Sequence, residues 1–204
     1  MKKYFSKKRR SDEIMELLQR YQDKIKLNIG CGTDYKDGWI NIDNNSDNNI
    51  EKLDLNWDMR NPLPFKDNSA DFVFNEHFIE HLTPEESRLI IKDLMRVLKP
   101  GGVLRIATPD LRYVVEKYLH LEISDDPTMK KFGLDFIKTK AERMNIGFSW
   151  WGHKWLYDWE ELERRLKEVD CKKIKRSVLR KSKYSELRDL ETRDESTLIV
   201  EVTK

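Results

Sequence analysis

Two glycines and an aspartate at the ends of two short apolar runs are the residues of this chain best suited to bind a ligand. The first run, residues 25–29, ends in the turn Gly30-Cys31-Gly32, and the second, residues 39–42, is closed by Asp43. Glycine has no Cβ, so the backbone can turn tightly there and approach a ligand closely. An acidic side chain at the end of the next strand can accept hydrogen bonds from both hydroxyls of a ribose. The pattern predicts a site for a ribose-containing ligand.

Further polar residues stand directly after other apolar runs that we predict to be strands. Asn75 to His77 follow a run at residues 70–74, and Thr108 to Asp110 follow one at residues 103–107. In an open parallel sheet, ligands bind outside the carboxyl ends of the strands. We therefore expect these clusters to meet the glycine turn at one edge of the sheet, together with Asp54 from a third, short strand.

The alternation of strands and helices predicts an α/β fold, with a doubly wound parallel sheet and helices on both faces. One helix is expected from Ser11. A second begins at the capping box Thr83–Glu86, with proline at its first position, and ends at Lys99–Gly102. A third begins at Asp158. Strands are expected at residues 25–29, 39–42, 53–55, 70–74, 103–107, 173–178 and 197–202.

Composition limits the classes of protein to consider. The 204 residues include 39 Lys and Arg against 37 Asp and Glu, so the net charge of +2 does not by itself indicate a nucleic-acid partner. Cys31 and Cys171 are far apart, which argues against a disulfide framework or a cysteine-rich zinc site. No apolar run approaches the ~20 residues of a transmembrane segment, and no secretory signal is recognisable. We expect one cytoplasmic domain over residues 1–204.

Two basic stretches, within residues 2–10 and 172–183, stand out against this balance. Such a patch can bind RNA, an acidic lipid or an anionic substrate. It can equally be a solvated tail, with a helix up to residue 24, and a solvated loop. The sequence leaves both interpretations open, and the oligomeric state does not follow from it.

The motifs, in this order, resemble those of the class I S-adenosylmethionine-dependent methyltransferases, and more narrowly those of small methyltransferases associated with cell-surface glycan synthesis. The most characteristic segment is Val97–Gly102, which reads Val-Leu-Lys-Pro-Gly-Gly. The resemblance runs from residue 26 to the C-terminus. It implies a Rossmann-like methyltransferase fold, whose mostly parallel seven-stranded sheet has an antiparallel last strand and a helical lid insertion. The other matching segments are residues 27–32, 38–43, 63–69, 76–82, 105–110 and 153–158.

The resemblance implies that the cofactor is S-adenosyl-L-methionine and the product S-adenosyl-L-homocysteine. Asp43 is then expected to bind the ribose hydroxyls. Asp54 is expected to accept a hydrogen bond from the adenine amine, and Leu55 to pack on the adenine ring. Asn75 is expected to offer its backbone carbonyl to the cofactor ammonium. The backbone under the methionine part is expected to be that of Gly30, Cys31, Gly32 and Thr33.

Two positions depart from the pattern of the family. Asn28 stands where many relatives carry an acidic residue, which weakens the polar support expected for the glycine loop. Asp34 stands where many carry a third glycine, so the loop is expected to turn differently. Asp34 could itself face the cofactor ammonium.

The implied reaction is methyl transfer to an acceptor hydroxyl, for which the protein must align the reactants and remove a proton. Histidine is the natural base because its pKa lies near neutral pH. His77 is the first candidate and His153 the second, while Asp110 could orient the base or the acceptor. Glu80 and His81 are expected to hold the loop by hydrogen bonds to backbone. We expect no metal site.

Residues 111–157 are too many for a simple connection, and such lengths usually belong to a lid or a binding element. We expect short helices that cover the cofactor and form most of the acceptor pocket, with hinges at Gly133 and Gly147. The aromatic cluster Phe148–Trp151 lies at the far end of this segment. A small saccharide or glycan hydroxyl is the first choice of acceptor, and RNA is the second.

The same motifs allow three other interpretations. His77-Phe78-Ile79-Glu80-His81 also spells the inverted zincin motif, in which two histidines on one helical face bind zinc. The capping box at Thr83 starts a new helix two residues after His81, so a helix that carries both histidines of the motif would have at most two turns. A dehydrogenase normally has a third glycine where Tyr35 stands. A methyltransferase fold that binds a partner or senses the cofactor without catalysis is the remaining alternative.

Overall fold

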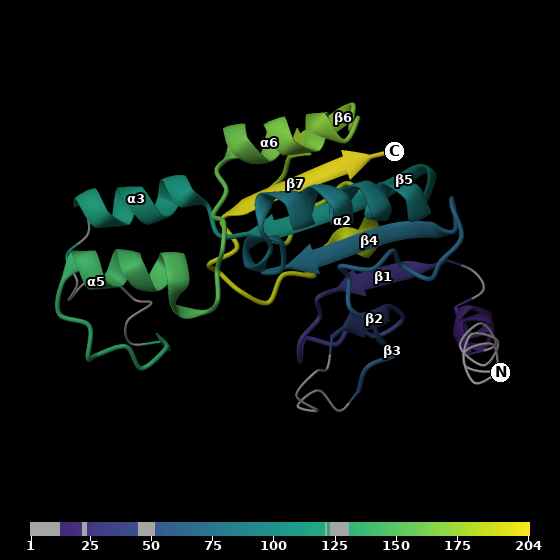
Figure 1. Ribbon diagram of the computed structural model, residues 1–204, viewed down its shortest axis with the longest axis horizontal. Coiled ribbons are helices and arrows are strands. Elements are labelled where there is room, and N and C mark those ends of the chain that lie inside the picture. Colours follow the sequence, from purple (N-terminus) through teal and green to yellow (C-terminus); the bar gives the residue numbers. More distant parts are fainter. Residues whose placement is uncertain (1–12, 22–23, 45–51, 121, 123–130) are drawn as a thin grey trace.

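The computed structural model describes residues 13–21, 24–44, 52–120, 122 and 131–204. Seven strands form one sheet in the order β3-β2-β1-β4-β5-β7-β6 (Figure 1). Strands β1 to β5 pair in parallel, and β7 is antiparallel to both of its neighbours. The predicted sheet is thereby confirmed. The strands are Lys26–Ile29, Ile40–Asp43, Leu55–Asn56, Ala70–Glu76, Leu98–Thr108, Lys173–Arg176 and Leu198–Thr203, from β1 to β7.

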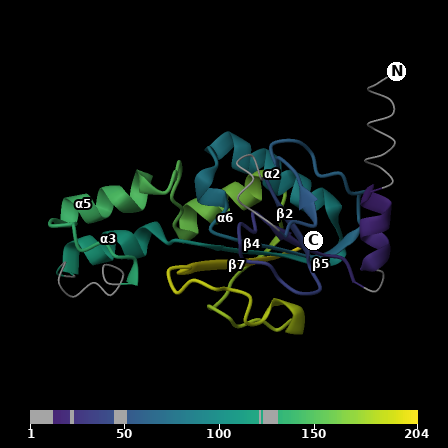
Figure 2. The same ribbon diagram turned by 90° about the horizontal axis from the view of Figure 1, so that it is seen from below.

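Helices cover one face of the sheet. Helix α2, Pro84–Val97, begins at the predicted capping box, in which the Thr83 side chain accepts from the Glu86 amide. Helix α6, Trp159–Glu168, begins at Asp158, whose carboxylate accepts from the Glu161 amide at 2.8 Å. Residues 13–20 form a further helix, whereas its expected cap, Ser11, lies outside the described residues. Helices α2 and α6 lie on the same side of the sheet (Figure 2). The apolar side chains of all three helices join one buried core with the strands.

The second face is covered differently. Its core contains Trp39, Phe74 and Leu187, and the chain that packs on it is the segment 177–197. Apart from the 3-10 helix η4, Ser185–Leu187, this segment consists of turns and irregular chain. The expectation of helices on both faces is therefore confirmed for one face, and irregular chain takes their place on the other.

Two element boundaries differ from those predicted. Lys99–Gly102 does not separate a helix from a strand, because β5 already begins at Leu98. The Gly101 amide donates to the Lys204 carbonyl and the Lys204 amide to the Gly102 carbonyl, both at 3.0 Å, so the end of the chain continues the ladder. A Cβ on Gly102 would lie 3.0 Å from the Asp71 carbonyl oxygen, which is why glycine stands there. In addition, Asp54 precedes β3 instead of closing it.

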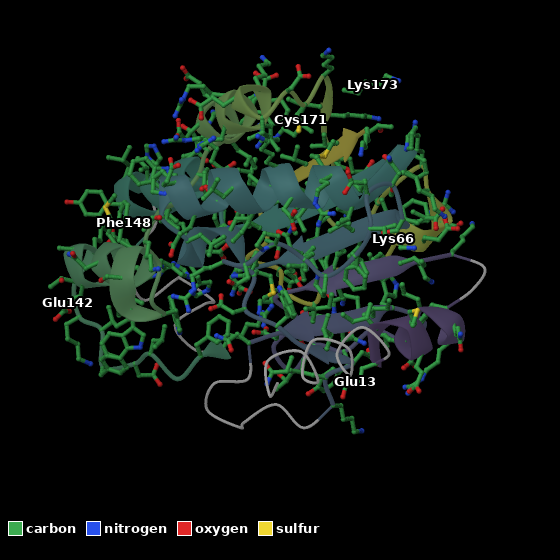
Figure 3. All side chains as sticks on the ribbon, turned by 45° about the vertical axis from the view of Figure 1, so that its right-hand side comes forward. Glu13, Lys66, Glu142, Phe148, Cys171 and Lys173 are labelled. Atoms are coloured by element: carbon green, nitrogen blue, oxygen red, sulfur yellow. The ribbon has the colours of Figure 1, made fainter. Side chains whose placement is uncertain are left out.

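The segment after β5 forms a separate helical unit at the carboxyl edge of the sheet (Figure 1). It contains α3, Leu111–His120, α5, Lys140–Asn145, and a π-helical turn η3, Ile146–Trp150. Leu134, Ile137 and Ile146 form a small core of its own. Figure 3 shows Glu142 and Phe148 on this protruding part. No helix in the described part of the chain is long and apolar enough to cross a lipid bilayer.

The buried guanidinium of Arg105 joins the segment 177–197 to the sheet. The Arg105 side chain of β5 is fully buried and pairs with Glu191 and with Glu201, the latter at 2.6 Å. It also donates to the Val178 carbonyl at 3.0 Å and the Lys181 carbonyl at 3.1 Å. Because two carboxylates and several backbone acceptors surround one cation, removing the cation leaves buried charge unpaired.

We expect Arg105→Ala to lower the free energy of unfolding by about 3–5 kcal/mol, the range found when one partner of a buried ion pair is removed. Urea titration followed by circular dichroism measures this change. The matched control is Arg112→Ala, because Arg112 is exposed and makes an ion pair with Glu116 four residues away. A loss for Arg105→Ala no larger than that of the control would contradict the role given to Arg105.

Candidate functional site

The glycine turn and Asp43 lie together, as predicted. The amides of Gly30 and Cys31 donate to the Ile42 carbonyl at 2.9 and 3.2 Å, which ties the turn to the end of β2. The Gly32 amide donates to Asp43 Oδ2 at 2.7 Å. Both glycines have positive φ, +66° at Gly30 and +50° at Gly32, a region that other residues rarely adopt. The carboxylate of Asp43 is thus fixed beside the turn.

The two glycines have different surroundings. A Cβ on Gly30 would lie 2.4 Å from the ring of Phe78, whereas a Cβ on Gly32 would meet nothing within 4 Å. Gly30 therefore serves close packing, and Gly32 faces open space. Thr33 is exposed, while burial raises the pKa of the Cys31 thiol to about 12, so this thiol stays protonated.

Asp54 and Asn28 hold this part of the sheet together. Asp54 accepts from the amide and the side chain of Asn41, at 2.8 and 3.0 Å. Asn28 donates to the Asp34 carbonyl at 3.0 Å and to the Asn41 side chain at 2.9 Å. Asn28 thus supplies polar support to the loop. The adenine contact of Asp54 and Leu55 stays a prediction, because one oxygen of the Asp54 carboxylate is already engaged with Asn41.

Buried polar atoms without hydrogen-bond partners gather at the end of β4. They belong to Asn75, whose side-chain oxygen and nitrogen both lack a partner, to Nε2 of His77 and to Oε1 of Glu80. Such atoms are rare in folded proteins because each costs its desolvation free energy. Their concentration at the predicted edge points to a site where ligands complete the hydrogen bonding.

Arg193 is a site residue that the sequence analysis missed, and Glu76 is one to which it gave no role. The buried Glu76 carboxylate accepts from the Thr192 amide, the Arg193 amide and the Ser196 hydroxyl. These bonds bring Arg193 over the glycine loop, where its guanidinium pairs with Asp34 at 2.8 Å.

Because β7 is antiparallel, the chain that precedes it must lie at the carboxyl edge of the other strands. That topological argument could have identified residues 192–197.

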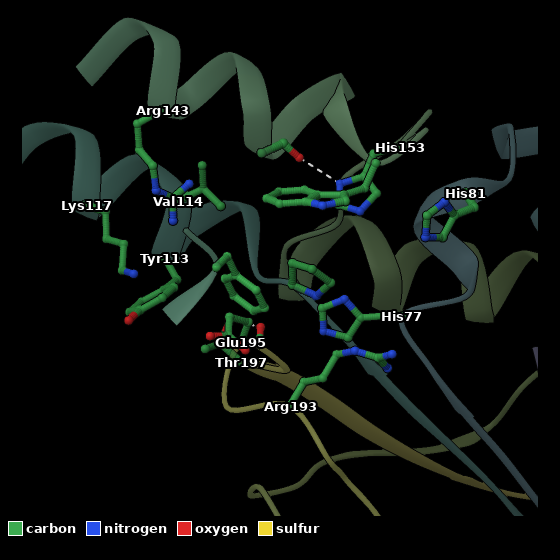
Figure 4. A pocket seen from close by; sticks show the side chains of 14 residues that line it. His77, His81, Tyr113, Val114, Lys117, Arg143, His153, Arg193, Glu195 and Thr197 are labelled. Atoms are coloured by element: carbon green, nitrogen blue, oxygen red, sulfur yellow. Dashed lines mark hydrogen bonds between the residues drawn. The ribbon is translucent and has the colours of Figure 1, made fainter. Parts of the chain in front are cut away.

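A cavity of about 360 Å³ lies between this edge and the helical unit of α3 and α5 (Figure 4). Aromatic and charged side chains share its wall with two histidines that were predicted for the site. Arg193 lines this cavity and also the small space beside Gly30 and Cys31, so the two are neighbours. The side chains used below are His77, His81, Tyr113, Phe132, Trp151 and His153.

Comparison with known proteins agrees with this geometry. Residues 31–106 match a family model described as a methyltransferase domain, which is less than half of the chain. This match, together with the fold, supports an S-adenosylmethionine-dependent methyltransferase. A search of curated proteins gives no match.

Two solved structures share the fold of this methyltransferase. A SAM-dependent methyltransferase from Archaeoglobus fulgidus is 17% identical, with a TM-score of 0.51 and coverage of 95% of this chain and 94% of that one. A SAM-dependent methyltransferase from Thermotoga maritima, described as a possible histamine N-methyltransferase, is 19% identical. Its TM-score is 0.50, and the match covers 93% of this chain and 88% of that one.

The residues at the edge of the methyltransferase sheet fit its cofactor. Gly32 leaves open space above the loop, and the Asp43 carboxylate stands beside it. The unpartnered side chain of Asn75 lies on the neighbouring strand β4. Together they offer an acceptor for hydroxyl groups and room for a ligand close to the backbone.

His77 lies at the end of β4 and lines the cavity. Its backbone is left-handed, with φ +49°, which turns the residue at the end of β4, and the ring lines the cavity. Nδ1 of His77 lies 3.2 Å from Oε1 of Glu80, in reach but not aligned as a hydrogen bond. Burial, and then the charge of Arg193, lowers the pKa of His77 to about 4, whereas burial raises the pKa of Glu80 to about 7.

His81 and His153 come from distant segments and meet at the cavity. Their ring centroids are 4.9 Å apart. His81 hydrogen-bonds to the Gly152 backbone, as predicted for a residue that holds the loop. The Glu80 side chain also bonds to backbone, at its own amide, and it accepts from the Thr108 hydroxyl as well. The Glu80 carbonyl accepts from the amides of Lys154 and Trp155.

The inverted zincin geometry is not formed. Residues 79–81 make a 3-10 helix, η1, and His77 precedes it with a left-handed backbone. The two histidines of the motif therefore do not share the face of one α-helix.

Of the three predicted catalytic residues, Asp110 is the one that does not line the cavity. Its carboxylate accepts from the Arg112 amide at 2.9 Å and pairs with Arg176 at 3.1 Å. Its own amide donates to the Thr197 hydroxyl. Burial raises the pKa of Asp110. In this arrangement it joins the start of α3 to the last two strands.

We expect Glu76→Gln to lower the free energy of unfolding at pH 7 by about 1–3 kcal/mol, the scale of hydrogen bonds to a charged group. Burial alone would raise the pKa of Glu76, but bonds from Ser196, Thr192 and Arg193 outweigh it and lower the pKa. The stabilisation is therefore present above the pKa of about 4.3 of an unfolded glutamate and is lost as pH falls through the folded pKa.

Urea unfolding at a series of pH values between 3 and 8 tests this expectation. The difference between the wild type and Glu76→Gln should shrink in acid. Glu116→Gln, which changes a half-exposed carboxylate on α3, is the control. A difference for Glu76→Gln that stays constant down to pH 3 would show that the charge of Glu76 does not stabilise the loop.

Proposed function

We propose that this methyltransferase methylates a hydroxyl group of a sugar or glycan bound in the 360 Å³ cavity. The proposal rests on which side chains line this cavity. The rings of Tyr113, Phe132 and Trp151 lie in the same cavity as His77, whose Nε2 has no partner. Aromatic faces pack well on the apolar faces of sugar rings, and a free imidazole nitrogen suits a hydroxyl.

The cofactor occupies the neighbouring edge in this proposal. S-adenosylmethionine supplies, when bound, an electrophilic methyl group on a sulfonium. Asp43 accepts the ribose hydroxyls, and Asp54 with Leu55 contacts the adenine. Asn75 offers its backbone carbonyl to the ammonium, and Arg193 exchanges its ion pair with Asp34 for one with the carboxylate. The backbone of residues 30–33 runs along the methionine part.

His77 acts as the base. Its low pKa keeps the imidazole neutral at pH 7, so Nε2 would accept the hydroxyl proton while the oxygen takes the methyl group from the sulfonium, which would leave as the neutral thioether S-adenosylhomocysteine. Glu80 then faces the protonated ring across the 3.2 Å gap to Nδ1. His153 and Asp110, the other predicted catalytic residues, position the lid and the start of α3 through their contacts with backbone.

The helical unit of residues 111–157 serves as the lid. It supplies Tyr113, Phe132 and Trp151 to the cavity, and Gly133 has a left-handed φ of +63° suited to a hinge. A closed lid excludes water from the reacting groups and aligns them, which is the main task of the protein when the methyl donor is already reactive.

His77→Asn and Asp43→Ala should separate the two halves of the site. Asparagine tolerates the left-handed backbone of residue 77 but is no base. We expect His77→Asn to lower kcat by about 10²–10⁴-fold, the effect of a lost general base, with the Kd of the cofactor unchanged.

Asp43→Ala should weaken cofactor binding by about 1.5–3 kcal/mol, the scale of a hydrogen bond to a charged group. Titration calorimetry and single-turnover kinetics measure both. Normal turnover in His77→Asn would remove His77 as the base.

Transfer of labelled methyl groups identifies the acceptor class. Nucleotide sugars, oligosaccharides and total RNA are offered in parallel to the wild type and to His77→Asn. We expect incorporation into a sugar by the wild type alone. Incorporation into RNA alone would reject the sugar proposal and favour the RNA alternative. Cofactor binding without incorporation into any class would favour a non-catalytic role.

A further inference from the structure

Glu80, His81 and His153 bring three metal-ligating groups to one wall of the acceptor cavity. A carboxylate oxygen and one ring nitrogen from each histidine all lie within 4.8 Å of one another. Glu80 and His81 belong to η1, and His153 follows the π-helical turn η3, so the fold and not a local motif assembles the group. Figure 4 shows His81 and His153 on the same side of the cavity.

Each of the three side chains is held by one atom and has another available. Nδ1 of His153 bonds the Gly147 carbonyl at 2.7 Å, and His81 bonds the Gly152 backbone. Histidines that bind metals usually anchor their second nitrogen in this way. Glu80 accepts from the Thr108 hydroxyl with Oε2, at 3.0 Å.

The remaining oxygen of Glu80 is the independent sign of a ligand. Glu80 is fully buried, and its Oε1 makes no hydrogen bond, although Nδ1 of His77 lies 3.2 Å away. A carboxylate oxygen in that state costs several kcal/mol of lost hydration unless a cation or proton compensates it. The neighbouring imidazoles offer nitrogen lone pairs, not positive charge, when they are neutral.

We propose that Glu80, His81 and His153 bind one divalent transition-metal ion, such as Zn²⁺ or Mn²⁺. Two imidazoles and one carboxylate suit these ions, and they leave coordination positions open for water or substrate. Ligand atoms lie about 2.0–2.2 Å from zinc, so binding draws the three side chains closer together than they are here. Sequence analysis gave no metal site because the third ligand is 72 residues beyond His81 in the chain.

The ion would stand where the acceptor binds, since His81 and His153 both line the cavity. A metal ion polarises a hydroxyl oxygen and favours loss of its proton. It would therefore hold an acceptor hydroxyl toward His77 and restrict the acceptors to those with a well-placed oxygen. This consequence rests on the proposed function, whereas metal binding itself does not.

Titration calorimetry of chelator-treated protein with Zn²⁺ and with Mn²⁺ tests the site. We expect one ion per chain in the wild type and at least about tenfold weaker binding in His153→Ala and Glu80→Gln, each of which loses one ligand. The matched control is His120→Ala. It removes the one histidine of the four that does not line the cavity and is exposed at the end of α3.

Visible absorption of bound Co²⁺ reports directly on the ligands. Its bands should change in His81→Gln and His153→Gln, which also serve if an alanine variant fails to fold by circular dichroism. The proposal is overturned if the folded wild type binds none of the three ions, or if it binds them as tightly after loss of His81, His153 or Glu80. Cofactor titration in the presence of chelator separates the two proposals, because a protein that binds metal but not cofactor contradicts only the proposed function.

Discussion

The buried guanidinium of Arg105 is the interaction on which the rest of this structure depends. One face of the sheet has helices, but the other is covered by the segment 177–197, which apart from the short helix η4 has no regular secondary structure to fix its shape. Arg105 supplies that shape by binding Glu191 and the carbonyls of Val178 and Lys181. The chain then enters the site at residues 192–197, where Glu76 holds it. The position of Arg193 over the glycine loop follows from both anchors.

Much of the fold and part of the site could be predicted because local chemistry determines them. The turn at Gly30 and Gly32 needs residues that tolerate a positive φ, and the Asp43 carboxylate follows from where β2 ends. The capping box at Thr83 sets the start of α2 without help from distant residues. His77 could be assigned to the sheet edge because it directly follows a buried strand.

What could not be predicted depends on contacts between distant segments. Asp54 lies one residue before β3 because pairing with β2, and not its own sequence, decides where that short strand begins. Lys99–Gly102 joins β5 because the end of the chain pairs with it. The meeting of His81 with His153 requires the path of a helical unit for which the sequence shows only length and aromatic content. Burial of the Glu80 carboxylate is likewise a property of the assembled edge.

The position of β7 has a consequence for the order of events during synthesis of the protein. This strand is the last of the seven along the chain, yet it lies inside the sheet between β5 and β6. The residues that lead into it form one wall of the cavity and carry Arg193. A nascent chain on the ribosome that has made the glycine loop, β4 and the helical unit therefore still has an open sheet and an unfinished pocket. The wall of the cavity that carries Arg193 is in place only after β7 has been made and has inserted between β5 and β6.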